Sequence, residues 1–293
     1  DTVSHGGLAD EGPVKFFAKE GIPEKGVLKD AIAIADISRT EGFGGHVLTG
    51  PIYVAGAEPG DMLEIRIKAV TPRVPYGVNN AGSGGAAADM IPGAARGSYV
   101  IKYDPAKKVA FFSPDITIPL RPFMGIMAVA PPKEISSRAP GDYGGNMDFQ
   151  KLQAGSTLYL PVHVKGGLFV TGDSHAAQGD GEVSGNALEA SMTPTLQFIV
   201  HKGAGKDMTN PYVEDKQNFY ILGQDPDLDK ALSSAIKETV KFLGVKYGLK
   251  PQDAYSLCST AVDFGLAQAV DDNLTMYGTV SKSWFKTKTP YWR

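Results

Sequence analysis

The sequence is poor in the features that mark several large classes of protein. It contains one cysteine, Cys258, so no internal disulfide framework can stabilise the fold. Its 29 basic and 32 acidic residues give a net charge of −3, which offers no basic footprint for nucleic acid or an anionic membrane. No apolar run approaches the roughly 20 residues that a membrane-spanning helix needs. We therefore expect neither nucleic acid nor a membrane as a partner.

Glycine and short apolar runs are what the sequence has in quantity. The chain of 293 residues is 42% hydrophobic and contains 35 glycines and 20 prolines, a composition that favours many turns between short strands. After a turn at 59–61, apolar and charged residues alternate along "LEIRIKA" (63–69), which is typical of a half-buried strand. In "GSTLYLPVHVKGGLFVTGD" (155–173), two apolar runs separated by Lys165–Gly167 predict a hairpin.

The last ninety residues favour helices instead. Apolar residues at helical spacing predict a helix over 227–247, with Asp227 or Asp229 as its N-cap. A second helix is predicted from Pro251 to about Val270. Strands followed by two helices predict an α+β fold, with a β-rich body of sandwich-like or barrel-like strands and two C-terminal helices. We divide it into a β-rich body (1–200) that contains the site and an α+β C-terminal part (201–293), joined as one integrated unit.

The stretch "TGDSHAAQGDGEVSG" (171–185) gathers acids around a histidine. Like charges this close repel each other unless something positive lies among them. Asp173 and His175 are two positions apart and can point to one place from a strand end, where their oxygen and nitrogen atoms suit a divalent metal. Glu182 could then act as a general base or proton shuttle. The alternative is a solvated acidic turn in which a neighbouring carboxylate satisfies His175, and composition alone does not decide between them.

Other candidates are weaker when taken singly. Asn146 and Asp148 in "GGNMD" could add an amide donor and a ligand, although an Asx-type turn is the commoner role. His46 follows two glycines, where a lone histidine is more often structural. Ser83 lacks the motif of a serine nucleophile, and Cys258 lies on an apolar helix face. The other histidines, His5, His163 and His201, have no acidic neighbours at a useful spacing.

Four segments together resemble the acetamidase/formamidase family. They are "GHVLTGPIYVAGAEPGD" (45–61), "PFMGIMAVAPP" (122–132), the block 144–189 and "LCSTAVDFGLAQAVDD" (257–272). The resemblance implies hydrolysis of a small amide to a carboxylate and ammonia, a β-rich fold with an α+β portion, and a homo-oligomer. Since no thiol or hydroxyl is a good nucleophile, the attacking group is expected to be water activated by a divalent metal, with zinc favoured over calcium.

The resemblance and the chemistry of the side chains together predict a role for each candidate residue. Asp173 and His175 are expected metal ligands, with Asp148 and His46 as further ligands, and Glu182 is expected to move the proton. Asn146 or Gln178 is expected to donate to the oxyanion or orient the amide, and Asp180 to hold His175. A metal-dependent hydrolase of a larger or cyclic amide, or a non-catalytic, metal-stabilised β protein that binds a small ligand, are the alternatives.

The first residues, "DTVSHGG", resemble an interior stretch of family members, which usually have several strands before it. We therefore expect that the beginning of the first domain is absent from this chain. A separate N-terminal piece of the same precursor, docked to it, is one hypothesis. The compartment stays undecided, with the cytoplasm slightly favoured and the periplasm or secretion also open.

Overall fold

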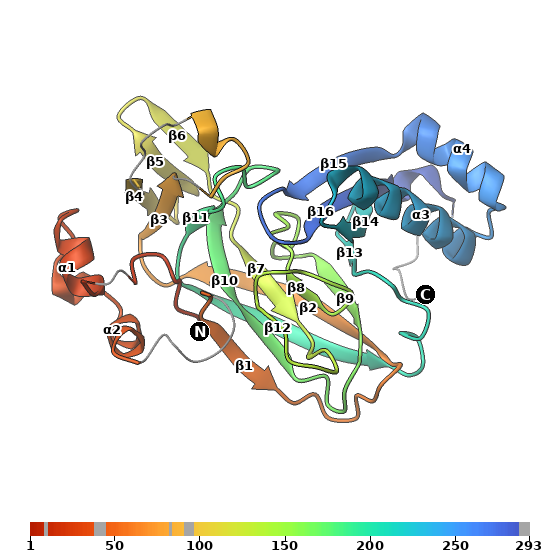
Figure 1. Ribbon diagram of the computed structural model, residues 1–293, viewed down its shortest axis with the longest axis horizontal. Coiled ribbons are helices and arrows are strands. Elements are labelled where there is room, and N and C mark those ends of the chain that lie inside the picture. Colours follow the sequence, from red (N-terminus) through yellow and green to blue (C-terminus); the bar gives the residue numbers. More distant parts are fainter. Residues whose placement is uncertain (9–10, 38–44, 82–83, 91–96, 287–293) are drawn as a thin grey trace.

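Two antiparallel sheets form the body of the protein (Figure 1). The computed structural model describes residues 1–8, 11–37, 45–81, 84–90 and 97–286. The nine-stranded sheet has the order β6-β5-β4-β3-β11-β10-β7-β8, and β1 pairs with β10. Its strands are β1 (Leu48–Ile52), β3 (Tyr76–Ala81), β4 (Gly97–Asp104), β5 (Val109–Ser113), β6 (Ile116–Pro119), β7 (Phe123–Ala128), β8 (Gly144–Asn146), β10 (Phe169–Ala177) and β11 (Leu188–Glu189).

The seven-stranded sheet has the order β12-β2-β9-β13-β14-β16-β15. Its strands are β2 (Met62–Pro72), β9 (Thr157–Pro161), β12 (Met192–His201), β13 (Tyr212–Glu214), β14 (Asn218–Asp225), β15 (Asp263–Gln268) and β16 (Leu274–Ser281). Strands from both sides of residue 200 therefore belong to one sheet. The division into two parts at that residue stays a prediction.

The predicted hairpin over 155–173 is wrong. A turn does form, with Gly166 and Gly167 at positive φ, but β9 pairs with β2 and β13 whereas β10 pairs with β1, β7 and β11. The two apolar runs thus enter different sheets, and both contribute buried residues such as Leu160 and Phe169 to the largest core cluster. An apolar run predicts that a strand is buried, but it does not predict which strand it pairs with.

The alternating strand is confirmed as β2, with one exception. Leu63, Ile65 and Ile67 are fully buried as expected. Glu64 is buried too, because His201 Nε2 on the neighbouring β12 lies 2.6 Å from its Oε2 and supplies a polar partner. A buried carboxylate is tolerated where such a partner exists.

The helix α3 (Leu228–Tyr247) confirms the first predicted helix and its cap. The side chain of Asp227 accepts a hydrogen bond from Lys230 N, and Gly248 takes the left-handed conformation that ends many helices. The second helix, α4 (Pro251–Ala261), is shorter than predicted, because residues 263–268 form the edge strand β15 against β16. Pairing along a sheet edge has overridden the local helical pattern there.

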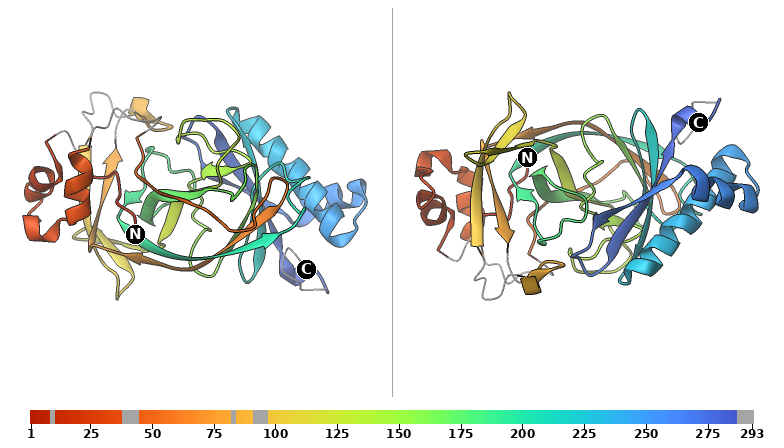
Figure 2. Two further views of the ribbon diagram at one scale, coloured as in Figure 1. Left: turned by 90° about the horizontal axis from the view of Figure 1, so that it is seen from below. Right: turned by 90° about the horizontal axis from the view of Figure 1, so that it is seen from above.

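Helices lie at both ends of the molecule (Figure 2). The helices α3 and α4 cover the β14–β16 end of the second sheet, and α1 (Pro13–Ala18) and α2 (Lys29–Ala35) lie beside β3 and β4. Three 3₁₀ turns, η1 (Glu24–Gly26), η2 (Ala88–Met90) and η3 (Lys282–Trp284), complete the described elements. The arrangement confirms an α+β fold with a β-rich body and two C-terminal helices. Among the described residues, no helix has the length and apolarity to cross a membrane.

Candidate functional site

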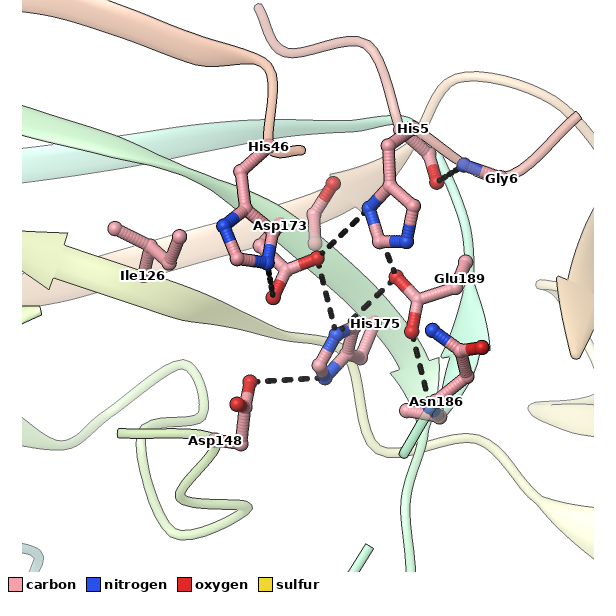
Figure 3. A network of polar contacts seen from close by, with 12 residues as sticks. His5, Gly6, His46, Ile126, Asp148, Asp173, His175, Asn186 and Glu189 are labelled. Atoms are coloured by element: carbon pink, nitrogen blue, oxygen red, sulfur yellow. Dashed lines mark hydrogen bonds and ion pairs between the residues drawn. The ribbon is translucent and has the colours of Figure 1, made fainter. Parts of the chain in front are cut away.

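Adjacent strands of the nine-stranded sheet bring the acids and histidines together (Figure 3). Asp173 and His175 lie on β10, and Glu189 lies on β11 directly across from His175. His175 Nε2 is 3.6 Å from Asp173 Oδ1 and 3.3 Å from Glu189 Oε2. The expectation that Asp173 and His175 point to one place is therefore met, and Glu189 joins them.

The N-terminal segment adds a second histidine. Thr2 N donates to Met192 O (2.8 Å) and Ser4 N donates to Ser191 Oγ (3.0 Å), which fixes this segment beside β12. His5 Nδ1 consequently lies 3.1 Å from Asp173 Oδ1 and 3.8 Å from Glu189 Oε2. We call His5, Asp173, His175 and Glu189 the histidine–carboxylate cluster.

His46 lies at the edge of this cluster, just before β1. Its Nε2 is 3.8 Å from Asp173 Oδ2, and its Nδ1 is 2.8 Å from Ser137 Oγ. Burial lowers the pKa of His46 and outweighs the opposing effect of Asp173. A neutral imidazole of this kind is the form that binds metals.

The facing atoms of the cluster have lone pairs and no hydrogen-bond partner. Within the described structure, this holds for His5 Nδ1, Asp173 Oδ1, His175 Nε2 and Glu189 Oε2, all of them buried atoms. Ligand atoms ~2.0–2.2 Å from a tetrahedral metal lie roughly 3.3–3.6 Å from one another, and most separations here are close to that range. The cluster could therefore hold a divalent cation with two imidazole and two carboxylate ligands.

The charges within the cluster are strongly coupled. Burial alone would lower the pKa of His5, but Glu189 and Asp173 outweigh it and raise this pKa to about 9. Burial likewise opposes the charged form of His175, and the same two carboxylates hold its pKa well above the usual value. Burial would raise the pKa of Asp173, but His175 and His5 keep it well below its usual range. The carboxylates of Asp173 and Glu189 thus stabilise positive charge between them, which protons on the histidines or a metal ion can supply.

A second group of acids, which we call the acid cluster, consists of Asp148, Glu182 and Asp271. Burial and the neighbouring carboxylates raise the pKa of Asp148 well above its usual value. Burial does the same for Glu182 and outweighs the opposing effect of His175. Burial also raises the pKa of Asp271, to about 6. These carboxyl groups are therefore able to hold protons near neutral pH, which suits them to proton transfer.

Backbone strain is concentrated at the two clusters. Five described residues other than glycine have positive φ, and three of them are Asp148 (φ 40°), Asp173 (φ 50°) and Glu182 (φ 44°). This conformation is unfavourable for residues with a Cβ and tends to persist where the surrounding structure enforces it, often at functional sites. The three strained residues are thus also residues whose pKa values are strongly shifted.

Gln178 connects the two clusters. Its Oε1 is 3.0 Å from His175 Nδ1, and its Nε2 donates to Asp148 O at 2.6 Å and to Ala267 O at 3.4 Å. Both amide hydrogens therefore go to backbone carbonyls. This favours a role in holding His175 over the predicted role of a donor to substrate.

Two cavities are lined by residues of the two clusters. One of about 420 Å³ is lined by His5, His46 and Asp271, together with Asn80, Arg138 and the 184–186 segment. The other, of about 390 Å³, is lined by Gln178 and Glu182, with Phe112 and Ile118 among its apolar residues. The first cavity has room for a small polar molecule beside His5 of the histidine–carboxylate cluster.

The structure thus places most of the predicted residues at one site. Asp173, His175, Asp148 and His46 lie together, and Glu182 and the buried Asn146 lie in or beside the acid cluster. The expected role of Asp180 is wrong, because its carboxylate accepts from Gln150 Nε2 (2.7 Å) and Tyr277 Oη (3.2 Å) and not from His175.

The sequence pattern misses three residues: His5, Glu189 and Asp271. Glu189 had a usable signal, since it is an acid within the small and apolar run "NALEASM" (186–192). His5 had none, because its partners are far away in the chain. Ser83 lies outside the described residues. Cys258 lies on α4 and is buried in a core cluster that contains no residue of the two site clusters.

The family model of the acetamidase/formamidase family matches residues 23–141 and 137–276. The chain belongs to this family. It is similar to a crystal structure of an acetamidase from Bacillus halodurans, with 32% identity and a TM-score of 0.76, covering 82% of this chain and 80% of that one. An acetamidase from Yersinia enterocolitica is 29% identical with a TM-score of 0.76, covering 82% of this chain and 74% of that one.

Curated relatives are matched over a smaller share of their length. A formamidase from Methylophilus methylotrophus is 29% identical in an alignment that covers 47% of this chain and 47% of that protein. The chain spans between 47% and 58% of the curated relatives it matches.

Proposed function

We propose that this chain forms the catalytic body of an amidase that hydrolyses small carboxylic amides to a carboxylate and ammonia. The observation that carries the proposal is the histidine–carboxylate cluster, which has buried, unpartnered ligand atoms in a member of the acetamidase/formamidase family. One of its residues, His5, lines a cavity together with His46. The proposed assembly is a homo-oligomer, and a docked N-terminal piece stays a hypothesis.

A divalent metal, with zinc preferred to calcium, is the proposed cofactor. His5, Asp173, His175 and Glu189 would hold it, with His46 next to them, and nitrogen ligands favour zinc over calcium. Asp148, predicted as a further ligand, forms a separate possible group with His175 and Glu182. When bound, the metal would polarise the amide carbonyl and lower the pKa of water.

The acid cluster supplies the proton transfers. Water is the proposed nucleophile, and Glu182 takes a proton from it and delivers that proton to the leaving nitrogen. The C–N bond breaks, the nitrogen leaves as ammonia, and the water oxygen becomes part of a carboxylic acid. That acid passes the remaining water proton to ammonia or solvent and becomes the carboxylate. A carboxyl group with a raised pKa is both a stronger base and a usable acid near neutral pH. Asn146, which lies beside Asp271, is proposed to orient the substrate amide.

Metal analysis combined with an ammonia-release assay tests the proposal. The ammonia assay covers formamide, acetamide and longer aliphatic amides, before and after treatment with a chelator. Hydrolysis of a small lactam yields an amino acid without ammonia, so it is followed by chromatography of that product. We expect ammonia from the small linear amides, loss of activity on chelation and recovery with zinc. Full activity without metal would overturn the metal assignment, ammonia from none of the linear amides would overturn the amidase assignment, and turnover of the lactam alone would favour the cyclic-amide alternative.

The role of Glu182 has its own test. Glu182→Gln removes the proton-carrying group with little change of shape and is expected to lower kcat at least 100-fold, a typical effect of removing a general acid–base group. Asp180→Asn is the matched control, because Asp180 lies on the same loop but contacts Gln150 and Tyr277. Near-normal turnover of Glu182→Gln would remove Glu182 from the mechanism.

A further inference from the structure

The amide of Gln178 can be oriented from its partners alone. Asp148 O and Ala267 O are backbone carbonyls, which only accept hydrogen bonds, and the same end of the Gln178 amide faces both. That end must be the NH₂ group, because the reversed amide would place its oxygen against two carbonyl oxygens. The Gln178 oxygen therefore faces His175 Nδ1, 3.0 Å away.

This orientation settles which imidazole nitrogen carries the hydrogen. An oxygen acceptor at hydrogen-bond distance requires a hydrogen on His175 Nδ1. In the neutral ring, Nε2 then has its lone pair exposed to Asp173 Oδ1 and Glu189 Oε2, which are acceptors as well. Three lone pairs that converge on one point repel one another unless a proton or a metal ion lies between them.

We propose that Gln178 is a positioning residue that keeps the hydrogen of His175 on Nδ1, so that Nε2 is the metal-ligating atom. The inference rests on the proposed metal site and refines it. Partners of this kind, which bind the other ring nitrogen of a ligating histidine, fix the tautomer and orient the ring.

The same geometry decides between two possible groups of ligands. His175 could join His5, Asp173 and Glu189 through Nε2, or Asp148 and Glu182 through the other side of the ring. Asp148 Oδ1 is 3.8 Å from Nδ1, farther away than the Gln178 oxygen. With Nδ1 occupied by its hydrogen, His175 joins the histidine–carboxylate cluster, and Asp148 and Glu182 stay free to hold protons.

Nuclear magnetic resonance of the metal-loaded protein tests the tautomer directly. The chain has five histidines, so ¹⁵N labelling of histidine gives a simple spectrum, and ¹¹³Cd replaces zinc as a spin probe. For His175, assigned by its loss in His175→Gln, we expect ¹¹³Cd coupling on Nε2 and a hydrogen on Nδ1. Coupling on Nδ1, or no cadmium bound to His175, overturns the inference.

Variants of Gln178 test its part in this arrangement. Gln178→Leu is expected to weaken zinc binding about 10–100-fold by calorimetric titration, the usual effect of losing such a partner. Gln178→Glu can still accept the Nδ1 hydrogen and should retain more affinity than Gln178→Leu. If Gln178 only filled space, the order would reverse, because glutamate adds buried charge.

Gln150→Leu is the matched control, since Gln150 is an equally buried glutamine whose side chain contacts Arg121 and Asp180. Its zinc affinity should equal that of the unaltered protein, and wild-type affinity in Gln178→Leu would overturn the inference. If Gln178→Leu fails to fold, the resonance pattern of the unaltered protein decides. That pattern is independent of turnover, so a protein inactive on amides with metal on Nε2 would refute the proposed function alone.

Discussion

Gly125 shows how closely the site is packed at the scale of one residue. It lies on β7, and a Cβ at this position would come within 2.3 Å of Asp148 Oδ1, 2.7 Å of Asp173 O and 2.9 Å of His175 Cε1. The missing side chain therefore makes room for groups from both clusters. No pattern in the sequence distinguishes this glycine from the many that only form turns.

We predict that Gly125→Ala weakens zinc binding at least tenfold, because Asp148 and the backbone of Asp173 must both move to admit the methyl group. Gly179→Ala is the control, since a Cβ there meets nothing within 4 Å. Calorimetric titration and thermal unfolding of both variants measure the effect. Unchanged zinc affinity in a folded Gly125→Ala would show that the site tolerates this movement.

The residues of the site were predictable only where they are close in sequence. Asp173 and His175 share a strand face, and their spacing alone predicted that they act together. Chemical roles could be predicted for Glu182 and Asp148 from the sequence, but their positions relative to His175 could not. His5 reaches Asp173 because backbone hydrogen bonds hold residues 2–4 beside β12, and that long-range contact has no local signature. In the sequence, a segment that only forms a turn cannot be distinguished from one that brings a ligand to the site, because the difference depends on contacts made in the folded sheet.

At the scale of single elements, helix signals were more reliable than strand pairing. The cap and the apolar stripe predicted α3 correctly, because each acts within a few residues. The pairing of β9 and β10 and the strand β15 depend on distant partners, and the sequence pattern failed for both. Which strands pair in a sheet depends on how the whole core packs, so a local sequence pattern does not determine it.

The N-cap of α3 offers a quantitative test. Asp227 accepts from Lys230 N, whereas Asp229 lies in the first turn without being the capping residue. Asp227→Ala is predicted to lower the free energy of unfolding by about 1 kcal/mol. Asp229→Ala should cost less, about 0.5 kcal/mol, since it loses only an interaction with the helix dipole. Urea denaturation of both variants distinguishes them, and equal losses would show that the cap contributes nothing beyond charge.

At the scale of the whole molecule, the second sheet holds the C-terminal part to the body. It contains β2, β9 and β12, which end at or before residue 201, and four later strands, so folding of the two parts is joined through one hydrogen-bonded sheet. The histidine–carboxylate cluster lies in the other sheet and gathers the N-terminal segment, β10 and β11. The charges of this cluster should therefore influence the stability of the whole chain.

The last prediction concerns the pH dependence of that stability without metal. The pKa of His5 is raised from 6.5 to about 9 in the folded state, so the folded chain binds more protons than the unfolded chain between these values. His175 is shifted in the same direction. The stabilisation is complete below pH 6.5 and is lost as the pH rises through about 9. The raised pKa of Asp271, about 6, and the lowered pKa of Asp173 act mainly at lower pH.

The melting temperature of the metal-free protein should therefore fall by several degrees between pH 6.5 and 9, measured by scanning calorimetry. Zinc should remove most of this decline, because the metal replaces the protons as the positive charge between the carboxylates. His5→Asn should flatten the profile of the metal-free protein, whereas His163→Asn, outside the cluster and beside Asp142, should not. A melting temperature that rises with pH in the metal-free protein would contradict the charge assignment of the cluster.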